Sequence, residues 1–174
     1  MRIRNRAILL CGVPTSGKSS WVAQNGDGYM IVSSDNIIEN YAKSVGSTYN
    51  DVFDDYIETA IELMLGQLRH FVRQGHNVII DQTHLTPKVR KRKLKMIPDH
   101  YEKIAVHFEI SKEEMFQRNH NKDRTKTIPD SVLESMHNSY VRPTVDEGFL
   151  AVYSSKEFSL VPVDNLSQQQ VISV

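Results

Sequence analysis

Residues 11–20 read CGVPTSGKSS, and the part from Gly12 to Ser19 fits the phosphate-loop pattern G-x-x-x-x-G-K-[ST] at every required position. A short apolar run, RAILLC (6–11), precedes the loop, and a helix is expected to begin near Lys18. Glycines let backbone N–H groups surround phosphates, and the helix N-terminus adds its dipole. The stretch therefore predicts a nucleoside triphosphate on a strand, loop and helix, rather than an ordinary Gly/Ser turn.

The residues of this loop have distinct expected roles. Lys18 is expected to reach the β- and γ-phosphates, and the Ser19 hydroxyl is expected to ligate Mg²⁺. The other members expected to contact the nucleotide are Gly12, Thr15, Ser16, Gly17 and Ser20.

The composition indicates an ordinary cytoplasmic protein without a general affinity for polyanions. The length of 174 residues suits one domain, and 21 basic residues balance 21 acidic ones, so a case for nucleic acid must be local. The single cysteine, Cys11, excludes an internal disulfide and fits a reducing compartment. No segment approaches the roughly 18 apolar residues of a membrane span, so no membrane association is expected. No sequence feature predicts an oligomeric state.

Apolar runs alternate with stretches of helical periodicity along the chain. Strands are expected at residues 6–11, 29–34, 77–81, 103–110 and 158–163, and the main helices at 18–25, 51–74, 88–97, 112–119 and 130–140. This alternation predicts a three-layer α/β fold with a roughly five-stranded parallel sheet. Since there is no repeat or linker, we expect a single domain over residues 1–174, with a loose Gln-rich tail at about 165–174.

Two acids follow expected strands. Asp35 comes just after the second strand, where a carboxylate can accept the proton of an attacking hydroxyl as a general base, although Ser33, Ser34 and Asp35 also suit a helix N-cap. Asp81 ends the third strand, in the position of a Walker B acid that holds Mg²⁺, and a turn-initiating aspartate is the alternative.

Cations gather in two places. Arg118, Lys122, Arg124 and Lys126 lie in or beside a polar segment between two helices, which suits either a lid over bound phosphates or a solvated loop. The run KVRKRKLK (88–95) carries six cations in eight residues and could steer a polyanion towards the site or be a solvated surface.

Four stretches together resemble the kinase domain of bacteriophage polynucleotide kinase, within the wider zeta toxin and polynucleotide kinase group of P-loop kinases. They are GVPTSGKSSW (12–21), IVSS followed by Asp35, VIIDQTHLTPKVR (78–90) and FQRNHNKDRTKTIPDSVLESM (116–136). The resemblance implies a P-loop kinase with a helical lid at about 119–129, ATP and Mg²⁺ as cofactors, and transfer of the γ-phosphate to a 5′-hydroxyl of DNA or RNA. It implies Asp35 as the general base, Lys18 as a catalytic cation, and Arg118 with Arg124 as lid arginines.

The sequence departs from this family pattern at three points. Ile38 stands where the phage enzymes carry an arginine that grips the acceptor, and Gln82 stands where they carry an acid, with Asp81 one position earlier. The lid spacing differs, so Lys122 competes with Arg124 for one role. An acceptor that is a nucleoside, a small metabolite or a hydroxymethylated base in DNA therefore stays open, as does a nucleotide-binding switch that hydrolyses ATP.

Overall fold

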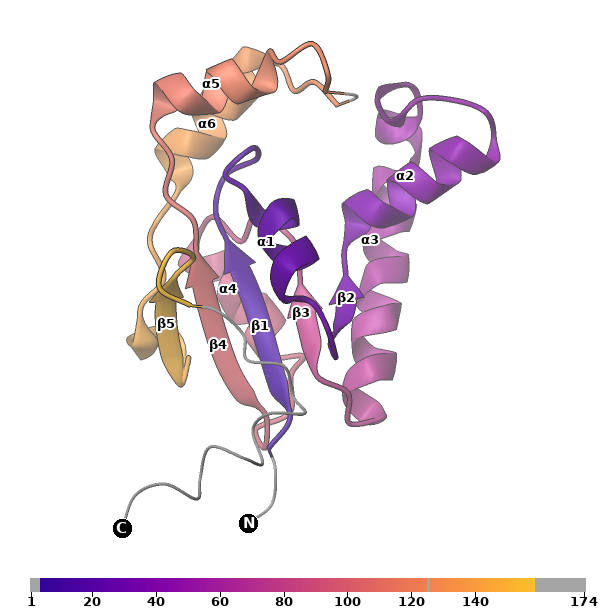
Figure 1. Cartoon of the computed structure of the whole chain (residues 1–174). Helices are drawn as coiled ribbons and strands as arrows, with labels where there is room; N and C mark the ends of the chain where they lie inside the picture. The colour runs from indigo at the N-terminus through magenta and orange to yellow at the C-terminus, as the bar shows by residue number, and fades with distance from the viewer. Residues whose placement is uncertain (1–3, 125, 159–174) are drawn as a thin grey trace.

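The computed structural model describes residues 4–124 and 126–158, and a five-stranded parallel sheet forms its centre (Figure 1). The strand order is β2-β3-β1-β4-β5, and every pair of neighbours is parallel. The strands are β1 (Arg6–Cys11), β2 (Met30–Val32), β3 (Val78–Ile80), β4 (Glu102–His107) and β5 (Ala151–Ser154). The predicted α/β class with a parallel sheet is confirmed.

Strand β1 lies in the middle of the sheet and packs on both faces. Its alternate residues Ala7, Leu9 and Cys11 belong to one apolar cluster, whereas Ile8 and Leu10 belong to another. Side chains of successive strand residues point to opposite faces, so a strand covered on both sides must be apolar throughout. Burial raises the pKa of the Cys11 thiol to about 12, so this cysteine is a packed side chain at neutral pH.

Helices cover the two faces and the carboxyl edge of this sheet (Figure 1). The apolar cluster of α3 and α4 lies on one face, the cluster of α1 on the other, and α5 packs with α6 above the carboxyl ends of the strands. The helices are α1 (Lys18–Asn25), α2 (Ser34–Ser44), α3 (Tyr49–Arg73), α4 (Pro87–Leu94), α5 (Lys112–Asn119) and α6 (Asp130–Ser139), with a 3-10 turn η1 (Val145–Glu147).

The fifth strand of the sheet lies earlier in the chain than the segment predicted for it, residues 158–163. Strand β5 is formed by Ala151–Ser154, which pairs with β4 in the register Val106 to Tyr153. Its residues are half-buried or exposed, as suits a short edge strand, so they lack the apolar contrast of the central strands. Most of the predicted strand, residues 159–163, and the expected loose tail at 165–174 lie outside the described residues.

The basic run at residues 88–95 is only partly exposed to solvent. Helix α4 ends at Leu94, earlier than predicted, and two of its cations are buried: Arg90 is fully buried and Lys93 is 8% exposed. Burial lowers the pKa of Lys93 to about 8. The periodicity of the helix therefore divides the run into an inner and an outer face.

In the described part of the chain, no helix has the length and apolar character that crossing a membrane would require.

Candidate active site

The phosphate loop connects the end of β1 to the start of α1 at the carboxyl edge of the sheet. Its backbone enters the left-handed region twice, at Thr15 (φ 66°) and at Gly17 (φ 99°), the latter being the N-cap of α1. A Cβ on Gly12 would lie 2.9 Å from Cβ and 3.0 Å from the backbone oxygen of Phe108. Glycine is therefore required at position 12 by close packing and at position 17 by conformation.

Lys18 occupies the centre of this loop. Its ammonium group donates hydrogen bonds to the backbone oxygens of Gly12 (2.9 Å) and Val13 (2.7 Å), and the side chain is buried. Burial lowers the pKa of Lys18 to about 8, and the charges of Asp81 and Asp35 oppose that shift. The loop thus holds a largely desolvated cation whose compensating acids come from two other strand ends.

The hydroxyl groups of the loop differ in their surroundings. Ser16 Oγ is buried and, among the described residues, has no hydrogen-bond partner, whereas Thr15 Oγ1 donates to the backbone oxygen of Met115 at 3.3 Å. Ser19 and Ser20 are exposed in the first turn of α1. A buried hydroxyl without a partner costs free energy, so Ser16 suits a loop that accepts phosphate oxygens.

Asp81 lies one residue beyond β3, the strand next to β1. Its backbone N–H donates to the backbone oxygen of Val32, the last residue of β2, at 2.9 Å. Asp81 therefore lies at the carboxyl edge of the sheet, next to the strand that precedes Asp35. Burial raises the pKa of the Asp81 carboxyl, the charge of Lys18 lowers it, and the charge of Asp35 raises it. The loop lysine and this carboxylate are therefore electrostatic partners.

Asp35 lies in the first turn of α2, exposed at the same edge. The N-cap of this helix is Ser33, whose side chain accepts from the backbone N–H of Asn36 at 3.3 Å. Capping is therefore done by Ser33, and the Asp35 carboxylate makes other contacts. Tyr49 Oη donates to its Oδ1 at 2.9 Å, and Lys126 Nζ lies 3.3 Å from its Oδ2.

Two side chains close to Asp35 were not predicted from the sequence as members of the site. Tyr49, at the start of α3, lies under the Lys126 ammonium, which is 4.5 Å from its ring centroid, and burial with the neighbouring Asp35 charge raises the pKa of Tyr49. Glu39 forms a second ion pair with Lys126. Glu39 follows Asp35 by four residues, so helical spacing could have suggested it, whereas nothing in the sequence indicates Tyr49.

The segment between α5 and α6 reaches from the phosphate loop to α2. Near its start, Arg118 donates to the backbone oxygen of Thr15 at 3.0 Å and pairs with Glu114. At its base, buried Asn119 bonds both backbone groups of Ile128 and closes the segment.

Of the two cations expected to compete for one role in this segment, only one lies near Asp35. Arg124 is half-buried, burial lowers its pKa, and the charge of Asp35 opposes that shift. Lys122 is exposed, and its side chain forms no hydrogen bond or ion pair within the described residues. Arg124 Nε donates to the backbone oxygen of Lys126 at 2.5 Å, and Lys126 pairs with Asp35, whereas Lys122 has no such link among the described residues.

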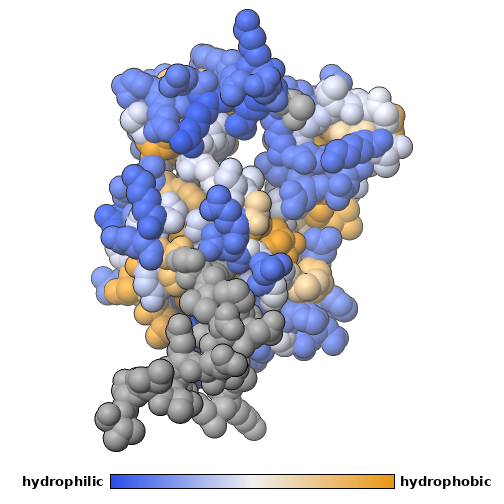
Figure 2. All heavy atoms as spheres, viewed as in Figure 1, coloured by the Kyte–Doolittle hydropathy of each residue, from blue (hydrophilic) through white to orange (hydrophobic). Residues whose placement is uncertain are grey.

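The space between these parts is open. Figure 2 shows the molecular surface hollowed between α5 and α6 on one side and α2 on the other, with mostly hydrophilic residues around the hollow. The phosphate loop lies at the carboxyl edge below it (Figure 1). Ligands of parallel α/β sheets bind at this edge, so the hollow is the candidate site.

The segment after β3 is hydrogen-bonded to the end of β1 and the start of the phosphate loop. Gly12 N–H donates to the backbone oxygen of Thr83 at 2.9 Å, and His84 Nδ1 lies 2.8 Å from the backbone oxygen of Leu10. His84 has φ 44° and is buried, which lowers its pKa to about 3. A neutral imidazole must donate through Nδ1 to that carbonyl, so His84 has a structural contact.

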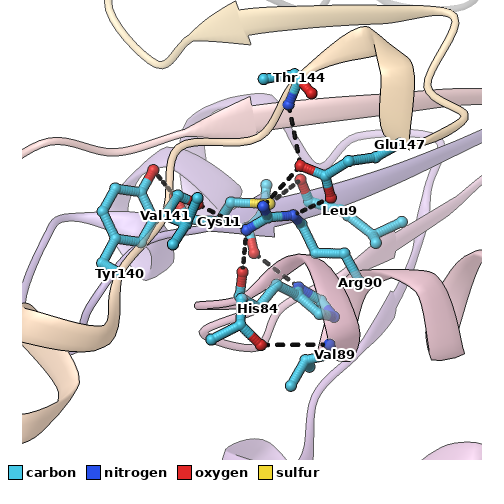
Figure 3. Close-up of polar contacts among 11 residues, drawn as sticks. Leu9, Cys11, His84, Val89, Arg90, Tyr140, Val141, Thr144 and Glu147 are labelled. Atoms are coloured by element: carbon cyan, nitrogen blue, oxygen red, sulfur yellow. Dashed lines mark hydrogen bonds and ion pairs between the residues drawn. The ribbon is translucent and has the colours of Figure 1, made fainter.

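Arg90 anchors this segment from α4. It is fully buried and pairs with both carboxylate oxygens of Glu147, at 2.6 and 2.7 Å, and it also donates to the backbone oxygens of His84 (2.8 Å) and Val141 (2.9 Å) (Figure 3).

Trp21, which follows the phosphate loop in α1, is a core residue that packs edge-on against Phe108.

Comparison with known proteins identifies one family model, described as an AAA domain, which matches residues 8–143. No curated protein sequence matches the chain. The fold is similar to that of a chain in the Pnkp1/Rnl/Hen1 RNA repair complex, with TM-score 0.63, 19% identity, and coverage of 80% of this chain and 45% of that one. The present chain thus spans less than half of that relative's length.

Two metabolite kinases have similar folds. A gluconokinase from Sinorhizobium meliloti has TM-score 0.53 at 20% identity, with coverage of 88% of this chain and 83% of that one. Shikimate kinase from Acinetobacter baumannii, solved with shikimate, has TM-score 0.52 at 18% identity, with coverage of 95% and 90%. At these identities the likeness concerns the fold, which is that of P-loop kinases.

Proposed function

The chain belongs to the AAA domain family, and we propose that it is an ATP-dependent kinase that transfers the γ-phosphate to a nucleic-acid hydroxyl, most simply the 5′-hydroxyl end of DNA or RNA. The observation that carries this proposal is the meeting of a phosphate loop, a candidate base and lid cations at one sheet edge. A nucleotide switch requires the loop, but it does not require the Asp35 carboxylate beside Arg124 and Lys126.

The phosphate loop would bind ATP. Lys18 would exchange its two loop carbonyl contacts for the β- and γ-phosphates, and Gly12, Thr15, Ser16, Gly17 and Ser20 would line the phosphates. The partnerless Ser16 hydroxyl supports this assignment, because a phosphate oxygen would satisfy it.

The residues present also fit Mg²⁺. Magnesium takes hard oxygen ligands and is usually bound through one or two carboxylates together with substrate phosphates. Ser19 and Asp81 supply a hydroxyl and a carboxylate at this edge, and the electrostatic link between Asp81 and Lys18 supports their nearness to the phosphates. When bound, the ion would neutralise charge that develops on the transferred group.

Asp35 would take the proton of the acceptor hydroxyl. Tyr49 holds one carboxylate oxygen, so the other oxygen, now paired with Lys126, is the one available to the acceptor. Arg118 and Arg124 would stabilise charge on the phosphates, with Lys122 in a secondary role because it is exposed and forms no hydrogen bond or ion pair in the described part of the chain. We also propose that residues 1–174 form one catalytic domain and that residues 119–129 form its lid. The proposal includes that this domain is related to the kinase domain of phage-type polynucleotide kinases.

Transfer can be tested with labelled ATP and a 5′-hydroxyl oligonucleotide. Wild-type protein is expected to label the oligonucleotide, and Asp35→Asn is expected to lower the rate by at least about 100-fold, since general base catalysis contributes that much. Asp54→Asn is the matched control, because it removes an exposed carboxylate on α3 that has no described contact. Absence of label with wild type at every salt concentration would contradict the proposal.

A second candidate keeps the kinase and changes the acceptor to a nucleoside, a small metabolite or a hydroxymethylated base. The Ile38 side chain is fully buried against the core, so α2 offers no cation at this position for an acceptor phosphate. The folds of gluconokinase and shikimate kinase also accommodate small acceptors. Assays with free nucleosides, 5′-hydroxyl oligomers, hydroxymethylated DNA and sugar acids in parallel would distinguish the two, and faster transfer to a small acceptor would favour this one.

A further inference from the structure

The outer face of α4 carries four cations that the proposed reaction does not use. Lys88, Lys91, Arg92 and Lys95 are all exposed, and Lys95 caps the helix end. Lys91 and Arg92 are adjacent, and each lies three or four residues from both Lys88 and Lys95. Residues at this spacing lie on one side of a helix, about one turn or 5.4 Å apart. We call these four residues the α4 stripe.

Buried contacts hold the stripe towards solvent. Arg90 is fixed by its bidentate pair with Glu147 and by two backbone oxygens (Figure 3), and Leu94 belongs to the core under the sheet. Because Arg90 and Leu94 are four residues apart, they define the inner face of the helix. The rotation of α4, and with it the direction of the stripe, is therefore set by the core.

The charge of the stripe is uncompensated. Helix α4 contains no acidic residue, and none of the four side chains makes an ion pair or side-chain hydrogen bond in the described part of the chain. Like charges three or four residues apart destabilise a helix. In a protein with 21 basic and 21 acidic residues, this local excess points to an anionic partner.

The segment that leads into α4 contacts the phosphate loop. Thr83, three residues before the N-cap Thr86, accepts the backbone hydrogen bond of Gly12 at 2.9 Å. Because β3 and β4 are both parallel to β1, the connection through α4 returns from the carboxyl edge of the sheet to its amino edge. Beyond Lys95, a pocket of about 390 Å³ is lined by two further cations, Arg69 and Arg73, together with the apolar residues Val72, Met96 and Pro98. The basic surface thus leads away from the candidate site.

We propose that the α4 stripe is a docking surface for the phosphodiester backbone of a single-stranded nucleic acid whose end lies in the candidate site. This inference rests on the proposed function and makes its acceptor a polymer. Cations at regular intervals suit a chain of phosphates, and electrostatic contacts of this kind supply affinity without sequence preference. An anionic membrane is the less suitable partner, because Val89 is the exposed large apolar side chain of α4, Leu94 faces the core, and no aromatic residue lies on the helix.

The test is binding of an oligonucleotide that cannot act as an acceptor. The probe is a 5′-phosphorylated, fluorescein-labelled single strand of roughly 20 nucleotides, titrated by anisotropy between about 50 and 200 mM salt. The variant Lys88→Gln/Lys91→Gln/Arg92→Gln/Lys95→Gln is expected to weaken binding at least about tenfold and to lower the salt slope by about 2 to 3, since each phosphate contact contributes about 0.7. The variant is expected to fold, because repulsive pairs are removed, and thermal melting checks this.

A matched control separates location from net charge. The variant Arg4→Gln/Lys43→Gln/Arg142→Gln/Lys156→Gln removes the same number of exposed cations elsewhere and is expected to keep the wild-type salt slope within about one unit. Equal losses in both variants, no loss in either, or wild-type binding to phosphatidylserine vesicles but not to the oligonucleotide would overturn the docking surface.

The docking surface and the proposed function can fail separately. Since the probe accepts no phosphate, a stripe effect without any transfer would overturn only the kinase proposal. In the transfer assay, the stripe variant is expected to raise KM for a long 5′-hydroxyl strand at least about fivefold and to leave KM for a 5′-hydroxyl dinucleotide unchanged. Equal KM changes for the two acceptors would overturn the docking surface while leaving the kinase.

Discussion

The buried pair of Arg90 and Glu147 gives the sharpest stability prediction. Glu147→Gln keeps the size of the side chain but removes its charge, and the amide can accept at only one oxygen where the carboxylate now accepts from Arg90 at two. The Arg90 guanidinium is fully buried, so its charge would remain without a counter-charge. Removing one partner of a buried ion pair costs about 3–5 kcal/mol.

This loss is large against the total stability of a protein of this size, which is about 5–15 kcal/mol. Urea unfolding followed by circular dichroism should show a lower midpoint with an unchanged slope. The expected decrease in Tm is about 6–20 °C, at about 2–4 °C per kcal/mol. Because Arg90 also holds the backbone oxygen of His84, weaker ATP binding should accompany the loss.

Two further variants make the reasoning falsifiable. Glu109→Gln removes the partner of exposed Arg142, at 3.7 Å, and should cost no more than about 1 kcal/mol. Arg90→Met/Glu147→Leu should be less destabilised than the sum of its two single variants by at least about 1 kcal/mol, because no unpaired charge remains. A cost below about 1 kcal/mol for Glu147→Gln, or strict additivity in the cycle, would refute the buried-charge argument.

Other predictions concern the site and the inner face of α4. Tyr49→Phe removes the donor to Asp35 Oδ1 and should lower kcat about tenfold while the KM for ATP stays constant, and a matching change in both would contradict a positioning role. Gly12→Ala brings a Cβ to 2.9 Å from Phe108 Cβ, so nucleotide affinity measured by calorimetry should decrease at least about tenfold, and unchanged affinity would show that the loop can shift. Lys93→Met should raise stability below pH 8 by about 1–3 kcal/mol, because burial penalises the charged lysine. Wild-type Lys93 loses its proton at about pH 8 when folded but at 10.5 when unfolded, so the gain should decrease between these two pH values, and a gain constant across them would exclude the titration.

Local features of the site could be predicted because their causes are local. The spacing of Gly12, Gly17 and Lys18 is a property of eight consecutive residues, and the structure has the loop between a buried strand and a helix. The α/β class followed from alternating periodicities in the same way. Asp81 could be placed at a strand end because it follows an apolar run directly, and Asp35 just beyond one because only Ser33 and Ser34 separate it from Val32.

Contacts between distant segments could not be predicted in this way. Strand order puts β3 between β1 and β2, so Asp81, rather than Asp35, becomes the main charge partner of Lys18. Tyr49 reaches Asp35 because α3 packs against α2, and Lys126 reaches it from 91 residues away along the chain.

The run KVRKRKLK (88–95) shows most clearly which properties depend on the local sequence and which depend on tertiary packing. The sequence by itself determined that a phosphate loop precedes a helix, that the sheet is parallel, and that a helical run with six cations follows Pro87. Only the tertiary structure decided which of those cations are buried, because that depends on Glu147, 57 residues from Arg90, and on the core beneath Leu94. Periodicity specifies that a helix has two faces, whereas packing against the rest of the chain specifies which face meets solvent.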